Sequence, residues 1–80
     1  MNRATVIMSR PLTSHMLEML MDCHERELMN LEPFDVASLH YPNGLIERGL
    51  LETRPYITKS GKKIMGFYVT GAGRRYLSKL

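Results

Sequence analysis

Residues 45–70 read LIERGLLETRPYITKSGKKIMGFYVT, and this stretch decides the fold. Leu45 precedes Gly49 by about one helical turn, and glycine closes helices because it enters the left-handed conformation without a Cβ penalty. Two runs rich in β-branched and aromatic residues follow, 51–58 and 63–69, and a turn that contains lysines separates them. The stretch therefore predicts the end of a short helix, a glycine stop and a β-hairpin with a basic tip.

The motif LIERGLLE occupies residues 45–52, and YVTGAGRRYL occupies residues 68–77. Together they resemble the second half of winged helix-turn-helix regulators of the MarR and PadR kind. In those proteins the recognition helix ends in a Leu-x-x-x-Gly-Leu-Ile/Leu stretch. The second strand of the wing ends in Tyr-x-Leu-Thr-x-x-Gly, which opens the last helix. The resemblance implies an α+β winged-helix fold and a DNA-binding function.

The first half of the chain follows a helical pattern. Apolar side chains recur at three- and four-residue steps between residues 13 and 30, which is the period of one helix face. Thr13 is the expected N-cap, and Asn30 and Pro33 are expected to end this helix. A second helix is expected to start near Asp35, again a candidate N-cap.

Shorter segments complete the expected fold. Residues 4–8 form either a small strand or a loose arm. A short third helix is expected over about residues 43–48, and Thr70 is expected to cap a last helix over residues 72–80. Residues 1–80 are thus expected to form one α+β domain with three helices, a two-stranded hairpin wing and a C-terminal helix. Its predicted core consists of Leu17, Leu20, Leu28, Leu39, Leu45, Ile46, Leu50, Phe67, Val69 and Leu77.

The apolar residues of the hairpin also predict its register. A turn with an odd number of residues keeps the larger apolar side chains of both strands on one face, whereas a one-residue slip separates them. A glycine bulge at Gly61 would give such a turn. Pro55 has no N–H to donate, so its nitrogen is expected to face an open edge. The expected facing pairs are Ile57 with Met65, Pro55 with Phe67 and Thr53 with Val69.

The net charge of +3 is unevenly distributed along the chain. Residues 1–40 hold three basic and six acidic residues, whereas residues 41–80 hold eight basic and two acidic residues. No acidic residue follows Glu52. This segregation predicts a positive side and a polyanionic partner. The alternative is that the acidic first helix simply neutralises its basic neighbours.

The sequence offers little for metal binding or catalysis. The single cysteine, Cys23, excludes an internal disulfide and is typical of a reducing compartment. His24 is adjacent to Cys23, but His15 and His40 add no zinc-ligand spacing, so we expect neither metal nor cofactor. Neighbouring residues of a helix point about 100° apart, which argues against a Cys–His nucleophile, and we expect no enzyme.

The chain has no apolar run long enough to span a membrane and no apolar core of a signal peptide. We therefore expect a cytoplasmic protein without membrane contact.

These patterns favour a small regulator or accessory factor that binds double-stranded DNA through phosphate contacts at the wing tip. Each lysine of the turn, taken alone, is more simply explained as a solubilising charge. The prediction of phosphate binding therefore depends on the three lysines occurring together. Nine residues separate Leu39 from Gly49, so the recognition helix is short and little base reading is expected. The candidate nucleic-acid-binding residues are Asn43, Arg48, Arg54, Lys59, Lys62, Lys63, Arg74 and Arg75.

The alternative function is a protein-interaction module on the same scaffold. Met19, Met21 and Met29 widen the apolar stripe of the first helix beyond what one small core needs, although methionine also fills irregular gaps in cores. Met8 adds a fourth methionine in the N-terminal arm. An exposed apolar face usually marks an interface. We therefore expect a homodimer, or contact with a protein partner, through the first helix and the N-terminal arm.

Overall fold

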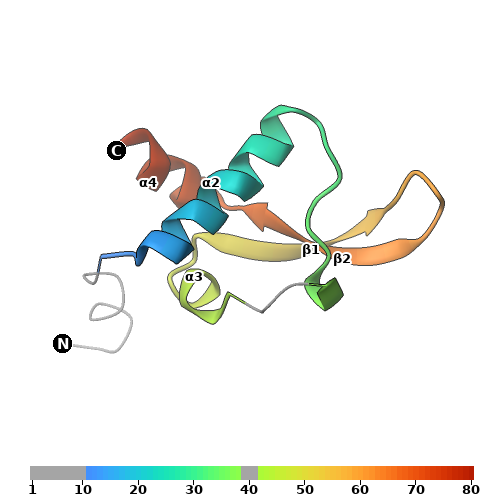
Figure 1. Ribbon diagram of the computed structural model, residues 1–80, viewed down its shortest axis with the longest axis horizontal. Coiled ribbons are helices and arrows are strands. Elements are labelled where there is room, and N and C mark those ends of the chain that lie inside the picture. The colour runs from blue at the N-terminus through green and yellow to red at the C-terminus, as the bar shows by residue number, and fades with distance from the viewer. Residues whose placement is uncertain (1–10, 39–41) are drawn as a thin grey trace.

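The computed structural model describes residues 11–38 and 42–80. Three α-helices and one two-stranded antiparallel hairpin place the fold in the α+β class, as predicted (Figure 1). The predicted strand or arm at residues 4–8 and the predicted core residue Leu39 lie outside the described residues. In chain order the elements are α2 (Ser14–Leu28), the 3-10 helix η1 (Val36–Ser38), α3 (Asn43–Glu47), β1 (Leu51–Ile57), β2 (Lys63–Val69) and α4 (Gly71–Ser78).

Helix α2 begins and ends close to the predicted positions. Thr13 Oγ1 accepts the Met16 N–H at 3.1 Å, so the predicted N-cap is confirmed. At the other end Asn30 has a φ of 57°, and the Leu31 N–H donates to the Arg26 carbonyl at 2.9 Å. This bond across a left-handed residue is the Schellman arrangement, which satisfies carbonyls in the last turn of a helix.

Helix α3 ends in the same way. Gly49 has a φ of 71°, and the Leu50 N–H donates to the Leu45 carbonyl at 3.0 Å. Because glycine adopts this conformation without the steric cost that a Cβ brings, the sequence stops the helix here. The predicted glycine stop is confirmed, and the chain continues directly into β1.

Thr70 joins the end of α3 to the start of α4. Its Oγ1 accepts the Gly73 N–H at 3.0 Å and donates to the Gly49 carbonyl. Its backbone N–H donates to the Leu50 carbonyl at 3.1 Å. One hydroxyl therefore caps α4, as predicted, and also binds the backbone of the glycine stop.

Replacing Thr70 with alanine is expected to lower the free energy of unfolding by about 1–2 kcal/mol, because two backbone groups lose their partner. Thr70→Ser keeps the hydroxyl and is the matched control, with an expected loss well below that of alanine. Denaturant titrations of the three proteins measure this difference. Equal midpoints for wild type and Thr70→Ala would contradict the assigned role.

The hairpin has an odd-numbered turn and an apolar face, as predicted, but the predicted register is wrong by two residues. The Thr58 N–H donates to the Lys62 carbonyl at 2.8 Å, so only residues 59–61 form the loop, and Gly61 has a φ of 87°. Because the loop is this short, each residue of β1 faces a residue of β2 that lies two positions earlier in the sequence than the predicted partner. The observed pairs include Leu51 with Val69, Thr53 with Phe67, Pro55 with Met65 and Ile57 with Lys63.

Pro55 occupies the position predicted for it. Thr58 and Lys62 share a ladder hydrogen bond, and bonded pairs alternate with non-bonded pairs in an antiparallel ladder. The pair of Pro55 and Met65 is therefore non-bonded, and the proline nitrogen faces away from β2. In the described part of the chain, no strand pairs with that edge of β1.

The chain between α2 and η1 covers the other edge of the hairpin, along β2. The Phe34 carbonyl accepts the Phe67 N–H at 3.1 Å, and Asp35 forms an isolated antiparallel bridge with Gly66. A Cβ at Gly66 would lie 2.4 Å from Cγ of Pro33, so glycine permits this close crossing.

The expected second helix is largely wrong. Asp35 Oδ1 accepts the Ala37 N–H at 2.9 Å, so Asp35 is a cap as predicted, but in the described residues it caps only the three-residue η1. The physical reason is the pairing of the preceding chain with β2, which holds Phe34 and Asp35 extended until the turn begins.

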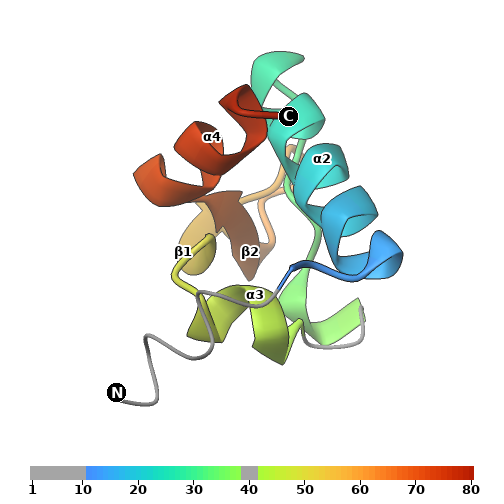
Figure 2. The same ribbon diagram turned by 90° about the vertical axis from the view of Figure 1, so that its left-hand side faces the viewer.

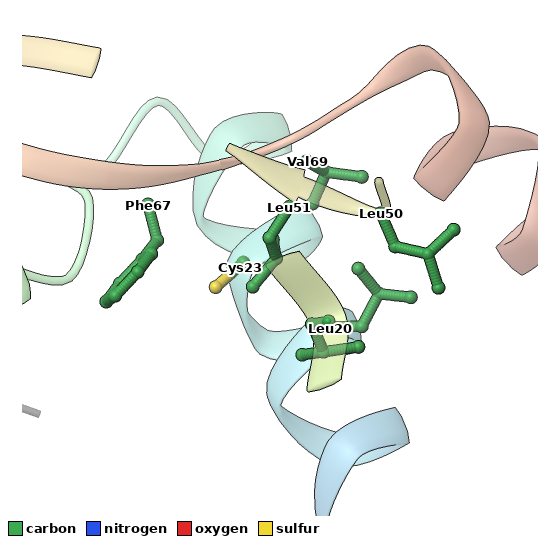
Figure 3. Packing of buried hydrophobic residues seen from close by; sticks show 7 residues of the cluster. Leu20, Cys23, Leu50, Leu51, Phe67 and Val69 are labelled. Atoms are coloured by element: carbon green, nitrogen blue, oxygen red, sulfur yellow. The ribbon is translucent and has the colours of Figure 1, made fainter. Parts of the chain in front are cut away.

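The core lies where α2 and α3 pack on the base of the hairpin, beside the first turn of α4 (Figure 2). The predicted core residues Leu17, Ile46 and Leu77 are half-buried. The buried apolar side chains are Leu20, Cys23, Leu45, Leu50, Leu51, Phe67 and Val69 (Figure 3).

The prediction that Leu28 belongs to the core is wrong, because its side chain is 73% exposed. Glu27 takes the inward position in the last turn of α2, where its Oε2 accepts the Val69 N–H at 2.8 Å. Leu28 stands about 100° further around the helix and faces solvent.

Candidate nucleic-acid interface

The hairpin turn holds three lysines at fixed backbone positions. Lys59 and Lys62 lie in the turn, and Lys63 begins β2. Thr58 Oγ1 accepts the Lys62 N–H at 3.0 Å and lies 2.9 Å from the Ser60 hydroxyl, so the loop is bonded internally. All three lysines are exposed, and within residues 11–38 and 42–80 none of them forms an ion pair. The turn therefore presents three solvated positive charges.

Arg48, the basic residue at the end of α3, is held against the helix. Arg48 is half-buried, and its Nη1 donates to the Gly44 carbonyl at 3.0 Å. The Nε of Arg48 is buried and has no hydrogen-bond partner in the described part of the chain. Asn43 is exposed at the start of the helix, but Glu47 is exposed at its end and would repel phosphate. The helix thus offers one polar candidate side chain to a ligand, next to an acid.

Neighbouring side chains hold Arg54 against β1. Its Nε lies 3.1 Å from Glu52 Oε1, and its guanidinium carbon lies 4.2 Å from the centroid of the Tyr68 ring. Both charged side chains are about half exposed, so the ion pair adds little to stability. It does offset the charge of Arg54, which makes this residue a weaker phosphate ligand than the turn lysines.

Helix α4 carries a second basic group, far from the hairpin turn. Arg74, Arg75 and Lys79 are all exposed, and Nη1 of Arg74 donates to the Val69 carbonyl at 3.1 Å. Figure 1 shows α4 and the hairpin turn at opposite ends of the hairpin, and Figure 2 shows α4 and α3 on opposite sides of it. The eight candidate residues therefore do not form one continuous face. The turn lysines and the α4 arginines are separate groups.

Two carboxylates that the sequence pattern does not single out lie against the hairpin. Glu32 Oε2 accepts the backbone N–H of Lys59 at 2.8 Å, near the tip, while Glu27 bonds Val69 at the base. Arg26 Nη1 donates to the Glu32 carbonyl and so holds this segment against the end of α2. These carboxylates act across separations of 27 and 42 residues, which no local sequence signal reveals.

Cys23 is a buried structural residue. Burial raises the pKa of its thiol to about 11, and the charges of Glu27 and Asp22 add to the shift. The thiol is therefore protonated at neutral pH and is a poor nucleophile or metal ligand. In the described part of the chain, no three His, Cys, Asp or Glu residues come close enough to hold a metal ion.

No protein-family model matches the chain, and neither the curated proteins nor the solved structures give a significant match. No helix within residues 11–38 and 42–80 is both long and apolar enough to cross a membrane. Function must therefore be argued from the charges and contacts of the site itself.

Proposed function

We propose that this chain is a small winged-helix protein that binds duplex DNA through the phosphate backbone, as a transcriptional regulator or accessory factor. The order of α2, the 3-10 helix η1, α3, the hairpin and α4 supports the winged-helix assignment. In this interpretation the hairpin is the wing, and Lys59, Lys62 and Lys63 are its phosphate ligands.

The observation that carries the proposal is the lysine-bearing turn. Three ammonium groups stand on five consecutive residues, and the hydrogen bonds of Thr58 fix the backbone that holds them. Neutralising phosphates releases condensed counterions, so each such contact adds affinity that falls as salt rises. Solvated lysines on a preordered loop suit this role because their charges are not occupied by acidic partners.

The proposed binding is largely independent of sequence. Base reading in the major groove needs side chains that reach base edges, and Arg or Lys on guanine is the commonest such contact. Here α3 has five residues, and the hydrogen bond from Arg48 to Gly44 turns the guanidinium back onto its own helix. Phosphate contacts position a protein on DNA but carry no sequence information.

An electrophoretic shift assay with random duplex DNA tests the proposal. We expect binding at low salt, with similar affinity for unrelated duplexes and a steep loss of affinity at moderate salt. A protein that leaves every duplex unshifted at low salt would contradict the proposal.

A second candidate is a protein-interaction module. The observation that favours it is the outer face of α2, where Met21, Leu28 and Met29 are exposed. Met19 is half-buried against the core, so it does not add to this face, and Met8 lies outside the described residues. The absence of a duplex shift at low salt, together with a specific protein complex, would favour this function over DNA binding.

A further inference from the structure

The exposed face of α2 combines acidic and apolar side chains. Positions 18, 21, 22, 25, 28 and 29 recur at three- and four-residue steps, so they share one face. All six are exposed, and the two sorts of side chain are interleaved along the helix. The acidic residues are Glu18, Asp22 and Glu25, and the apolar residues are Met21, Leu28 and Met29.

The distal half of the hairpin has the opposite charge and a similar apolar content. Ile57 and Met65 are 59% and 43% exposed, on the face that is buried nearer the hairpin base. A shallow cavity of about 350 Å³ lies beside Met65, between η1 and the start of β2, and Asp35, Val36 and Lys62 are among its other lining residues. The core ends before this part of the hairpin, so Ile57 and Met65 remain about half exposed in the described chain.

We propose that a second copy of this chain docks its α2 on the distal hairpin. The methionines and Leu28 of one copy then cover Ile57 and Met65 of the other, and the carboxylates of α2 meet the lysines of the turn. The inference rests on the interaction-module function and goes further by naming the partner and both surfaces.

Charge supports a second copy as the occupant of the distal hairpin. The three carboxylates of the helix face match the three lysines Lys59, Lys62 and Lys63 in number. The exposed charges of the helix face are acidic and those of the hairpin turn are basic, which is the complementarity that selects one partner over others.

Self-docking uses the same lysines as the proposed DNA contact. Duplex DNA and a second copy therefore compete for the hairpin turn, and rising protein concentration opposes DNA binding. In this arrangement the acidic helix limits the activity of the basic wing.

Sedimentation equilibrium up to high micromolar concentration, without DNA, tests the docking. We expect wild type to self-associate. The helix-reversed protein carries Glu18→Lys, Asp22→Lys and Glu25→Lys, and the hairpin-reversed protein carries Lys59→Glu, Lys62→Glu and Lys63→Glu. Each alone is expected to associate at least about tenfold more weakly, because three attractions become repulsions.

Sedimentation of a mixture of the two reversed proteins is the most discriminating measurement. Each supplies the charge that the other lacks, so the mixture is expected to form heteromeric complexes more strongly than either protein associates with itself. Lys79→Glu, at the C-cap of α4, reverses one charge outside both surfaces and is expected to leave association unchanged. Leu28→Ser removes apolar contact without reversing a charge and should also weaken association. Circular dichroism confirms the fold of each variant.

A wild type that remains monomeric at high micromolar concentration would overturn the docking. A mixture of the reversed proteins that fails to associate would do the same. Neither result bears on the electrophoretic assay, so failure of the docking is distinguishable from failure of DNA binding. It is also distinguishable from failure of the interaction-module function, which a complex with another protein would still support.

Discussion

Leu20→Ala is expected to lower the free energy of unfolding by about 2–5 kcal/mol, the range for truncating a fully buried leucine. Leu20 is 0% exposed and faces α3 and the hairpin from the middle of α2. A chain of 80 residues has a small core, so a loss of this size is a large share of its total stability. Alanine at this position leaves a cavity as well as removing apolar contact.

Leu28→Ala is the matched control, because it makes the same change on the same helix at an exposed position. Surface substitutions of this kind usually change stability by less than about 0.5 kcal/mol. Denaturant titrations of both variants measure the difference. Similar midpoints for the two variants would contradict the orientation of α2, and with it the assignment of Glu27 to the inward position.

Gly73→Ala is expected to lower the free energy of unfolding by about 1–3 kcal/mol, although alanine is normally the better residue in a helix. A Cβ at Gly73 would lie 2.4 Å from the Leu50 carbonyl oxygen and 2.7 Å from Cγ1 of Val69. The first of these is a backbone atom, so α4 or the start of β1 must shift to accept it. Gly73 is therefore required by the close packing of α4 on the hairpin base.

Gly71→Ala is the matched control in the first turn of the same helix. The nearest atom to its Cβ would be Nη1 of Arg75 at 3.4 Å, an ordinary contact with a flexible side chain. This substitution is expected to be neutral or stabilising by up to about 1 kcal/mol. Thermal unfolding of both variants should therefore give shifts of different size or sign. Equal losses for both would show that helix geometry, and not the contact with Leu50, explains the glycine.

The sequence predicted the features that depend on neighbouring residues. Thr13 and Thr70 cap their helices, and Gly49 ends α3, because each signal acts within about one turn of the chain. The odd-numbered turn followed from the requirement that the apolar faces of the two strands match. A shift of the register by two residues keeps the same faces together, so this requirement cannot distinguish the predicted register from the observed one. The predicted facing pairs were wrong for this reason.

Features that depend on distant parts of the chain were not predicted. The pairing of Phe34 and Asp35 with β2 shortens the second helix. Glu27, whose carboxylate accepts the Val69 N–H, takes the inward position and leaves Leu28 outward. For the candidate site, the lysines of the turn follow from their positions in the sequence. The bonds that hold Arg48, Arg54 and Arg74 depend on side-chain packing, which a charge count does not reveal.

The most direct test of the proposed function is a salt titration of duplex binding. Wild type is compared with the triple variant Lys59→Ala, Lys62→Ala, Lys63→Ala on two unrelated duplexes. If all three lysines bind phosphates, the slope of log affinity against log salt should fall by about 2.7, or about 0.9 for each lysine replaced, equally on both duplexes. The matched control, Arg74→Ala, Arg75→Ala, Lys79→Ala, removes the same charge from α4 and is expected to change the slope much less. Equal affinities for wild type and the hairpin variant at every salt concentration would contradict DNA binding through the hairpin turn.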